Sequence, residues 1–300
     1  DKRKSHFFNQ ITQIGNICSK KDINLHPQTK LVILLAAEHK DNIFPKSLYY
    51  EVNVEGTKNV LSVMEEQGIN NIIFTSSVAI YGLNKKNPDE TVPAQPFNDY
   101  GKSKLLAEEL IKNWCFRKPL KRSATIIRPT VIFGKRNRGN VYNLLNQINH
   151  ERFVMIGNGN NKKSIAYVEN VVAFIVHKTE NIKKGLYIYN YADKPDLTMN
   201  ELTSFVALKL GVKIPKMKIP YLLGLFAGLI FDFYSLIAKK KLKLSLIRVK
   251  KFCSNTQFDS TKAYSTFNPP YSIKEGLNKT LNYEFNNIND KKVLFYSEWI

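Results

Sequence analysis

The chain has 300 residues, of which 43% are apolar or aromatic and 23% are charged. It is therefore long enough and apolar enough to bury a large core, and the composition excludes a long disordered chain or a fibrous repeat. The formal net charge of +20 is compatible with nucleic-acid binding. However, the lysines and arginines are scattered and no known nucleic-acid-binding motif accompanies them, so we expect no nucleic-acid partner.

The cysteines and histidines point to no metal and no disulfide framework. Cys18, Cys115 and Cys253 lie far apart, which fits a reducing compartment. The five histidines show no metal-ligand spacing among themselves or with the cysteines. The first ten residues carry no apolar signal core, so we expect a cytoplasmic protein.

Short apolar runs alternate with longer segments of helical period in the first half of the chain. The apolar runs are at 31–37, 71–77 and 124–134, and the helical segments run from about Ser47 to Gln67 and from about Asp99 to Cys115. This alternation is typical of a parallel sheet covered by helices. We therefore expect an α/β fold whose ligand lies at the carboxyl ends of the strands.

Beyond about residue 135 the predicted elements are shorter. Two capping boxes, Thr198 with Glu201 and Ser272 with Glu275, predict the starts of two helices, and Gly211 predicts the end of the first. These elements indicate a second, smaller domain.

One apolar segment, IPYLLGLFAGLIFDFYSLIA at 219–238, is nearly long enough to span a bilayer and is followed by KKKLK. Asp232, Pro220 and two glycines argue against a span. We expect a buried or oligomer-interface helix, with peripheral membrane contact and a true span as the alternatives.

The clearest chemical signal is the segment NDYGKSKLLAEEL. Tyr100 and Lys104 are four residues apart, so on a helix they lie on one face. An ammonium beside a phenol stabilises the phenolate and lowers the tyrosine pKa from its ordinary value near 10, which produces a general base. Ser77 follows a predicted strand and would hydrogen-bond the reacting oxygen.

With these segments in place, the chain resembles a known family. The succession LLAAEH, EVNVEGTKNVL, FTSSVAIYG, YGKSK, IIRPTVIFG and SIAYVENVVAFI is similar to the NAD-dependent epimerase/dehydratase branch of the short-chain dehydrogenase/reductases. The resemblance implies a Rossmann-like, doubly wound parallel sheet that is truncated at its N-terminus. It also implies an incomplete dinucleotide-binding domain at 1–135 and a mainly substrate-binding domain at 136–300, with some segments returning to the first.

The resemblance further implies a role for individual residues. Tyr100 would be the acid/base, Lys104 would lower its pKa and hold the nicotinamide ribose, and Ser77 would match the catalytic Ser/Thr. The residues that match cofactor contacts of NAD or NADP are Asn16, Ile17, Ala36, Ala37, Asn53, Tyr100, Lys104 and Pro129. The residues that match substrate contacts are Ser77, Asn140, Lys163 and Arg248.

Several positions depart from the family pattern. Lys163 stands where many relatives have an Arg on the substrate diphosphate, and a Lys supplies the charge without the bidentate fork. Asn16 stands where relatives usually have an Asp. The glycine-rich turn G-x-x-G-x-x-G and its acidic partner are absent from these 300 residues. Because that turn supplies the main pyrophosphate site, we expect these 300 residues to bind cofactor poorly or not at all.

The reaction is narrowed by two apolar residues. Dehydratases of the family place an acidic pair after the catalytic Thr, whereas Val78 and Ala79 cannot move a proton, so dehydration is disfavoured. We expect a nucleotide-sugar epimerase of the UDP-sugar 4-epimerase type, supplying sugars for surface polysaccharide. The alternatives are a nucleotide-sugar 4-ketoreductase, a 3-beta-hydroxysteroid-type dehydrogenase and a cofactor-free remnant. The resemblance also implies a homodimer formed through the two long helices of the first half.

Overall fold

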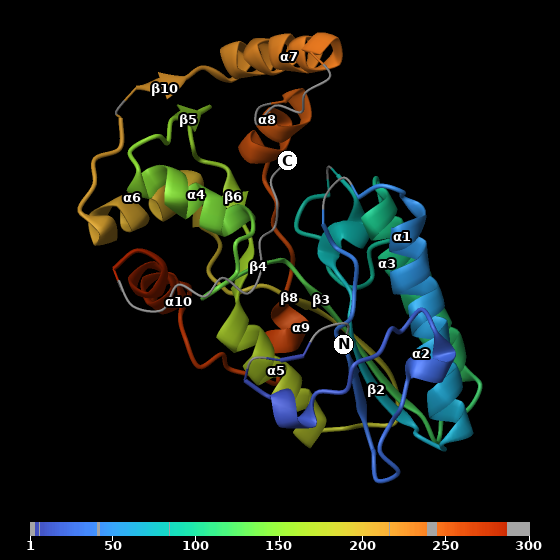
Figure 1. Ribbon diagram of the computed structural model, residues 1–300. Coiled ribbons are helices and arrows are strands. Elements are labelled where there is room, and N and C mark those ends of the chain that lie inside the picture. The colour runs from blue at the N-terminus through green and yellow to red at the C-terminus, as the bar shows by residue number, and fades with distance from the viewer. Residues whose placement is uncertain are drawn as a thin grey trace. The chain divides into compact units, whose positions relative to one another are not determined.

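Four parallel strands form the sheet at the centre of the first unit (Figure 1). The computed structural model describes residues 4–5, 7–40, 43–83, 85–215, 217–238 and 245–286, without the side chains of residues 9 and 235–238. The chain divides into two units. The first is Asp1–Thr130, Val172–Tyr191 and Asp259–Asn268, and the second is Val131–Val171, Ala192–Phe258 and Pro269–Ile300.

The sheet of the first unit has the order β1-β2-β3-β8. Its strands are β1 (Val32–Leu34), β2 (Asn71–Thr75), β3 (Ser123–Pro129) and β8 (Gly185–Tyr191). The register aligns Val32 with Ile72, Ile72 with Ala124, and Ala124 with Leu186. Because all pairs are parallel, the carboxyl ends of the four strands lie at one edge of the sheet.

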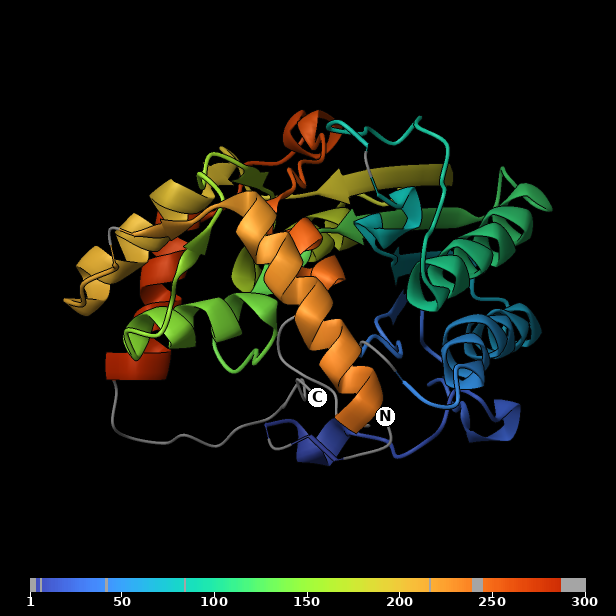
Figure 2. The ribbon, with the colours of Figure 1, turned by 90° about the horizontal axis from the view of Figure 1, so that it is seen from above.

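Helices pack on both faces of this sheet. On one face lie α1 (Ser47–Tyr50), the π-helical turn η3 (Glu51–Glu55), α2 (Gly56–Glu66) and α3 (Asp99–Phe116). Figures 1 and 2 show α2 and α3 running side by side. The helix α3 buries Ala107, Ile111, Trp114 and Cys115, which recur with the helical period and join the core under the sheet.

The other face is covered by aromatic packing. Phe174 of α5 (Val168–Glu180) contacts Tyr189 and Tyr191 of β8, and also Phe267, which follows α9 (Thr261–Tyr264), with ring centroids 5.6, 5.0 and 5.3 Å apart. A parallel sheet covered on both faces confirms the predicted α/β class.

The second unit is built from short strands and helices around its own core. Its strands are β4 (Val131–Phe133), β5 (Met155–Ile156), β6 (Lys162–Lys163), β7 (Ile165–Tyr167), β9 (Leu197–Thr198) and β10 (Lys218–Ile219). Its helices are α4 (Asn140–Asn149), α6 (Met199–Leu210), α7 (Tyr221–Ala238), α8 (Leu246–Cys253), α10 (Ile273–Leu281) and the π-helical turn η5 (Asn282–Asn286). Both predicted capping boxes are present, so the starts of α6 and α10 are confirmed.

Two predicted elements differ from the structure. The apolar run 124–134 is not one strand but two, because the chain leaves the first sheet after Pro129 and β4 pairs with β7 in the second unit. The predicted helix 47–67 is continuous but contains the wider turn η3. Neither feature has a local sequence signal strong enough to place it in advance.

Candidate active site

Helix α3 carries two of the predicted catalytic side chains. Its N-cap is Asn98, whose side-chain oxygen accepts a hydrogen bond from the Gly101 amide at 2.9 Å. Tyr100 and Lys104 follow on the first two turns, and their four-residue spacing places both on one face of the helix. Tyr100 is half-buried and Lys104 is buried.

Ser77 lies where the chain leaves strand β2. It is the N-cap of the 3-10 turn η4 (Val78–Tyr81), and its hydroxyl oxygen accepts a hydrogen bond from the Ala79 amide at 3.1 Å. A hydroxyl that accepts one bond still has its own proton to donate. The cap therefore fixes the side chain of Ser77 while leaving it able to act on a ligand.

Gly101 brings these two elements together. A Cβ atom at this position would lie 2.7 Å from the carbonyl oxygen of Ala79 and 3.0 Å from Pro96. The absence of a side chain thus lets the first turn of α3, which carries Tyr100, approach the turn that Ser77 begins. The sequence prediction that the two residues share one edge of the sheet rested on loop length, whereas the structure supplies this contact.

Lys104 is subject to opposing effects on its charge. Burial lowers its pKa to about 7, and the charge of Glu108, one helical turn further along, opposes this. The ammonium nitrogen also lies 4.2 Å from the centre of the Phe74 ring, where the face of an aromatic ring favours a cation. The lysine is therefore a buried group whose protonation responds to small changes around it.

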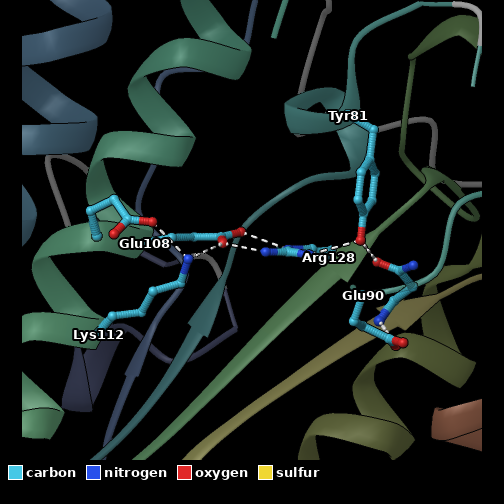
Figure 3. Close-up of polar contacts among 7 residues, drawn as sticks. Tyr81, Glu90, Glu108, Lys112 and Arg128 are labelled. Atoms are coloured by element: carbon cyan, nitrogen blue, oxygen red, sulfur yellow. Dashed lines mark hydrogen bonds and ion pairs between the residues drawn. The ribbon is translucent and has the colours of Figure 1, made fainter. Parts of the chain in front are cut away.

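Glu108 belongs to a buried polar network that the sequence analysis missed (Figure 3). Its two carboxylate oxygens accept hydrogen bonds from Nε and Nη2 of Arg128 on β3, at 2.9 and 2.7 Å. Arg128 Nη1 donates to the hydroxyl of Tyr81 at 2.7 Å, and that hydroxyl donates to Asn190 on β8 at 2.8 Å. All four side chains are buried.

This network links the elements that position the predicted catalytic residues. Tyr81 belongs to η4, the turn that Ser77 begins, and Glu108 belongs to α3, the helix of Tyr100 and Lys104. Burial lowers the pKa of Arg128 while the hydrogen bonds and charge of Glu108 raise it, with a net rise. Two features of the sequence could have suggested the pair of Glu108 and Arg128. One is a Glu placed one helical turn after Lys104, and the other is an Arg within the apolar run 124–134.

Asn53 fastens the loop that follows β1. Its side-chain oxygen accepts a hydrogen bond from the Glu38 amide at 2.8 Å, and its side-chain amide donates to the Glu38 carbonyl at 3.0 Å. The same amide donates to the Ser103 hydroxyl at 2.9 Å, which donates to the Tyr100 carbonyl at 2.8 Å. Asn53 therefore ties the loop of Ala36 and Ala37 to the helix that carries Tyr100.

The remaining predicted cofactor residues also belong to the first unit. Ala36 is exposed and Ala37 half-buried just after β1, while the buried Pro129 ends β3. Their small or flat side chains at strand ends fit a planar ligand that lies along the backbone. Asn16 and Ile17 precede β1, and Ile17 packs so close to α2 that a Cβ at Gly56 would lie 2.6 Å from it.

The predicted substrate residues Asn140, Lys163 and Arg248 all belong to the second unit. Asn140 is exposed at the first position of α4, and Arg248 is half-buried on α8. Lys163 donates hydrogen bonds to the carbonyl oxygens of Lys251 and Ser254, at 2.8 and 2.7 Å, and burial lowers its pKa to about 8. Lys163 thus holds the C-terminal end of α8 to strand β6, a structural role that the sequence did not suggest.

Within the described ranges, no group of three His, Cys, Asp or Glu side chains is arranged to hold a metal ion. The phenol of Tyr100 and the buried amine of Lys104 on α3, with the Ser77 hydroxyl at the start of η4, are groups that can transfer or hold protons.

Comparison with known proteins gives a family and several relatives. Residues 9–192 match the sequence profile described as the NAD dependent epimerase/dehydratase family. The chain is 54% identical, over 300 residues, to the N-acetyl-alpha-D-glucosaminyl-diphospho-ditrans,octacis-undecaprenol 4-epimerase of Escherichia coli O157:H7, which covers 99% of this chain and 91% of that protein.

Two further matches are more distant. The human sterol-4-alpha-carboxylate 3-dehydrogenase (decarboxylating) is 29% identical over 226 residues, which are 69% of this chain and 58% of that protein. The structure of UDP-glucuronic acid 4-epimerase from Bacillus cereus in complex with NAD is 18% identical with a TM-score of 0.66, over 85% of this chain and 74% of that chain. At 18% identity, the match to the Bacillus cereus structure shows a similar fold and nothing more.

Proposed function

Because the chain belongs to the NAD-dependent epimerase/dehydratase family, we propose that it inverts carbon 4 of an N-acetylated sugar joined through a diphosphate to a lipid. The observation that carries this proposal is the 54% identity to the Escherichia coli 4-epimerase along almost the whole chain. The sequence analysis expected a nucleotide as the carrier. In both cases the sugar is attached through a diphosphate. The difference is that a lipid, not a nucleoside, is attached to the other end of that diphosphate.

The protein is an enzyme of the epimerase type, and its cofactor is NAD or NADP. We propose that Ala36, Ala37, Asn53, Lys104 and Pro129 hold the nicotinamide half, because they lie at or are tied to the strand ends of the first unit. A bound nicotinamide would supply hydride transfer at carbon 4, which is chemistry that the side chains cannot perform on their own.

The side chains of the chain would move and hold the proton. The phenol of Tyr100 takes the proton of the sugar 4-hydroxyl during oxidation and returns it during reduction. The hydroxyl of Ser77 donates to the reacting oxygen and holds it against the phenol. Lys104 stabilises the phenolate, and its own protonation is favoured once the phenolate forms, so the two groups titrate together.

The proposed reaction would change carbon 4 of the sugar and no other carbon. Val78 and Ala79 follow Ser77 in the turn η4 and offer no acid or base for a second proton transfer. Inversion then requires only that the oxidised sugar present its other face before reduction. A 4-ketoreductase would use the same residues for the reduction alone.

A 3-beta-hydroxysteroid-type dehydrogenase is the second candidate, because the human sterol dehydrogenase is a relative. That similarity is 29% over 69% of the chain, against 54% over 99% for the epimerase, so the epimerase is favoured. The homodimer expected through the two long helices of the first half stays a prediction.

The test is turnover by the full-length protein with NAD. N-acetylglucosaminyl-diphospho-undecaprenol in detergent, UDP-N-acetylglucosamine and a 3-beta-hydroxysterol are supplied separately, and the sugars released by mild acid are separated by chromatography. We expect the 4-epimer, N-acetylgalactosamine, from the lipid-linked sugar. Faster conversion of the UDP-sugar would show that the substrate is a nucleotide sugar. Reduction of the cofactor by the sterol alone would favour the dehydrogenase. Conversion of none of the three substrates would contradict the proposal.

A further inference from the structure

Helix α7 exposes an unusual number of large apolar side chains. Nine of its side chains between Tyr221 and Tyr234 are at least 40% exposed: Tyr221, Leu222, Leu223, Phe226, Leu229, Ile230, Phe231, Phe233 and Tyr234. Figure 2 shows the length of this helix in orange. A contiguous apolar surface of this kind marks an interaction site, whereas single exposed apolar residues need no explanation.

The contacts of α7 with its own unit use one narrow stripe of the helix. Gly224 and Gly228 are buried, and a Cβ atom on them would lie 2.5 Å from Ile156 and 2.9 Å from the backbone of Leu246. Asp232, one turn further, accepts a hydrogen bond from the Leu246 amide at 3.0 Å and so caps the start of α8. By the helical period, Phe226 and Phe233 lie on the opposite side from this stripe.

The chain segment formed by α7 and α8 is positively charged. Asp232 is the single acidic residue in α7, and its carboxylate is bound to the start of α8. Helix α8 has no acidic residue and carries Arg248, Lys250 and Lys251, of which the two lysines are exposed beside the exposed Ile247. An apolar helix followed in the sequence by several cations and by no carboxylate up to Phe258 is complementary to the interface of a membrane that contains anionic lipids.

A helix that lies on the membrane fits these observations better than one that crosses it. Among the described helices none combines the length and the apolar character that a membrane span requires. Packing of the Gly224–Gly228 stripe against Ile156 and Leu246 also holds α7 to its unit along one side. The sequence analysis predicted a buried or oligomer-interface helix at 219–238. Burial is wrong for the exposed apolar side chains, whereas the oligomer interface stays a prediction.

We propose that α7 docks on the surface of an anionic membrane, with its outward apolar side chains in the interface and the positive charge of the segment that follows it attracting the protein to the lipid phosphates. The inference goes beyond the proposed function, since it stands on the geometry and charge of two helices. Under the proposed function, a docked enzyme would meet a lipid-linked sugar without extracting it from the bilayer.

The test is co-sedimentation of the full-length protein with vesicles, which requires no catalytic activity. Vesicles of phosphatidylethanolamine and phosphatidylglycerol are compared with vesicles of phosphatidylcholine. We expect binding to the anionic vesicles, which high salt weakens in the unaltered protein, and a loss on the order of tenfold in Phe226→Glu/Phe233→Glu. Lys250→Glu/Lys251→Glu should lose less, because α8 packs on the covered side of α7 and its lysines act through long-range attraction. Leu208→Glu is the matched control, because Leu208 is 79% exposed on α6 of the same unit and should keep full binding.

Other results would overturn the proposal. Absence of vesicle binding by the unaltered protein, equal binding by all variants, or an equal loss in Leu208→Glu would each do so. If Phe226→Glu/Phe233→Glu instead changed the sedimentation coefficient from dimer to monomer and left vesicle binding intact, α7 would be an interface between two copies of the chain. Membrane binding without epimerisation of the lipid-linked sugar would leave this proposal standing and remove the proposed function.

Discussion

Tyr100 is the residue on which the proposed chemistry depends most directly. It lies on the first turn of α3, its carbonyl is bound by Ser103, and its ring lies 6.4 Å from that of Tyr49. These contacts orient the side chain without consuming the proton that the reaction needs. Tyr100→Phe keeps the ring and both of these contacts.

We expect Tyr100→Phe in the full-length protein to lower kcat by about 100- to 10,000-fold, the usual contribution of a positioned acid/base, while NAD binding is kept. Turnover of the lipid-linked sugar and a titration with NAD measure the two effects. Tyr187→Phe is the control, because the Tyr187 hydroxyl bonds to the Lys184 carbonyl near the start of β8, away from the strand ends of the site. Retained turnover in Tyr100→Phe would remove the phenol from its role.

The pair of Glu108 and Arg128 gives a second prediction at the scale of residues. Removing one partner leaves the other charged and buried, so Glu108→Gln should lower the free energy of unfolding by about 3–5 kcal/mol. The double variant Glu108→Gln/Arg128→Met should lose less than the sum of the two single losses, with a coupling of about 2 kcal/mol.

Denaturant unfolding of the four proteins measures this cycle. The control is Glu109→Gln, which changes an exposed carboxylate on the same helix that pairs with Lys112, and should shift stability by less than about 1 kcal/mol. Additive losses in the cycle would show that the two charges stabilise the fold independently.

At the scale of elements, the close approach of α3 to the turn η4 decides whether Ser77 and Tyr100 act on one oxygen. Gly101 permits this approach, since a side chain there would meet the Ala79 carbonyl at 2.7 Å. A backbone oxygen cannot rotate away as a side chain can. One of the two elements must therefore shift if the glycine is replaced.

We expect Gly101→Ala to lower kcat by at least about tenfold, because a displacement on the order of an ångström weakens the alignment of the reacting groups. Stability should fall by about 1–3 kcal/mol. In Gly68→Ala, a left-handed residue with open space around it, stability should fall by about 1 kcal/mol while kcat is unchanged. Equal kcat in both variants would show that the contact of α3 with η4 does not position the site.

The elements with local sequence signals were the predictable ones. The capping boxes of α6 and α10, the left-handed Gly211 and the helix from Asp99 each depend on residues a few positions apart, and each is confirmed. The break of the predicted strand 124–134 depends on which strand each half pairs with. That choice is made by partners far away in the sequence, so the run of apolar residues could not show it.

The same distinction holds for the site. Tyr100 with Lys104, and Ser77 at a strand end, were readable because spacing and strand position are local properties. The network of Glu108, Arg128, Tyr81 and Asn190 joins residues separated by 20 to 109 positions. An Arg within an apolar run could suggest a buried partner, but the sequence does not show which distant residues supply it. Lys163 was matched to a substrate contact, whereas its hydrogen bonds to the end of α8 became visible only with the chain folded.

At the scale of the whole molecule, the buried Lys104 couples the chemistry of the site to stability. Its pKa is about 7 in the folded protein, lowered chiefly by burial, against an ordinary value of 10.5 in the unfolded chain. Between these two pH values the unfolded chain binds more protons than the folded one. The free energy of unfolding of the ligand-free protein should therefore rise as the pH rises from about 7 to 10.5.

Replacing the lysine by Met, which keeps the length and removes the charge, should abolish this dependence. We expect Lys104→Met to be more stable than the unaltered protein at pH 7 by about 4 kcal/mol and to approach it as the pH rises towards 10, since the cost of a buried charge is gone. Turnover should be lost in the same variant, because Lys104 stabilises the Tyr100 phenolate. The lysine therefore lowers the stability of the fold while it supports activity. Denaturant unfolding at pH 7, 8 and 9 measures the difference, with Lys102→Met on the exposed side of the same helix as the control. A Lys104→Met variant that is less stable at pH 7, or that keeps the pH dependence of the unaltered protein, would show that burial does not discharge this lysine.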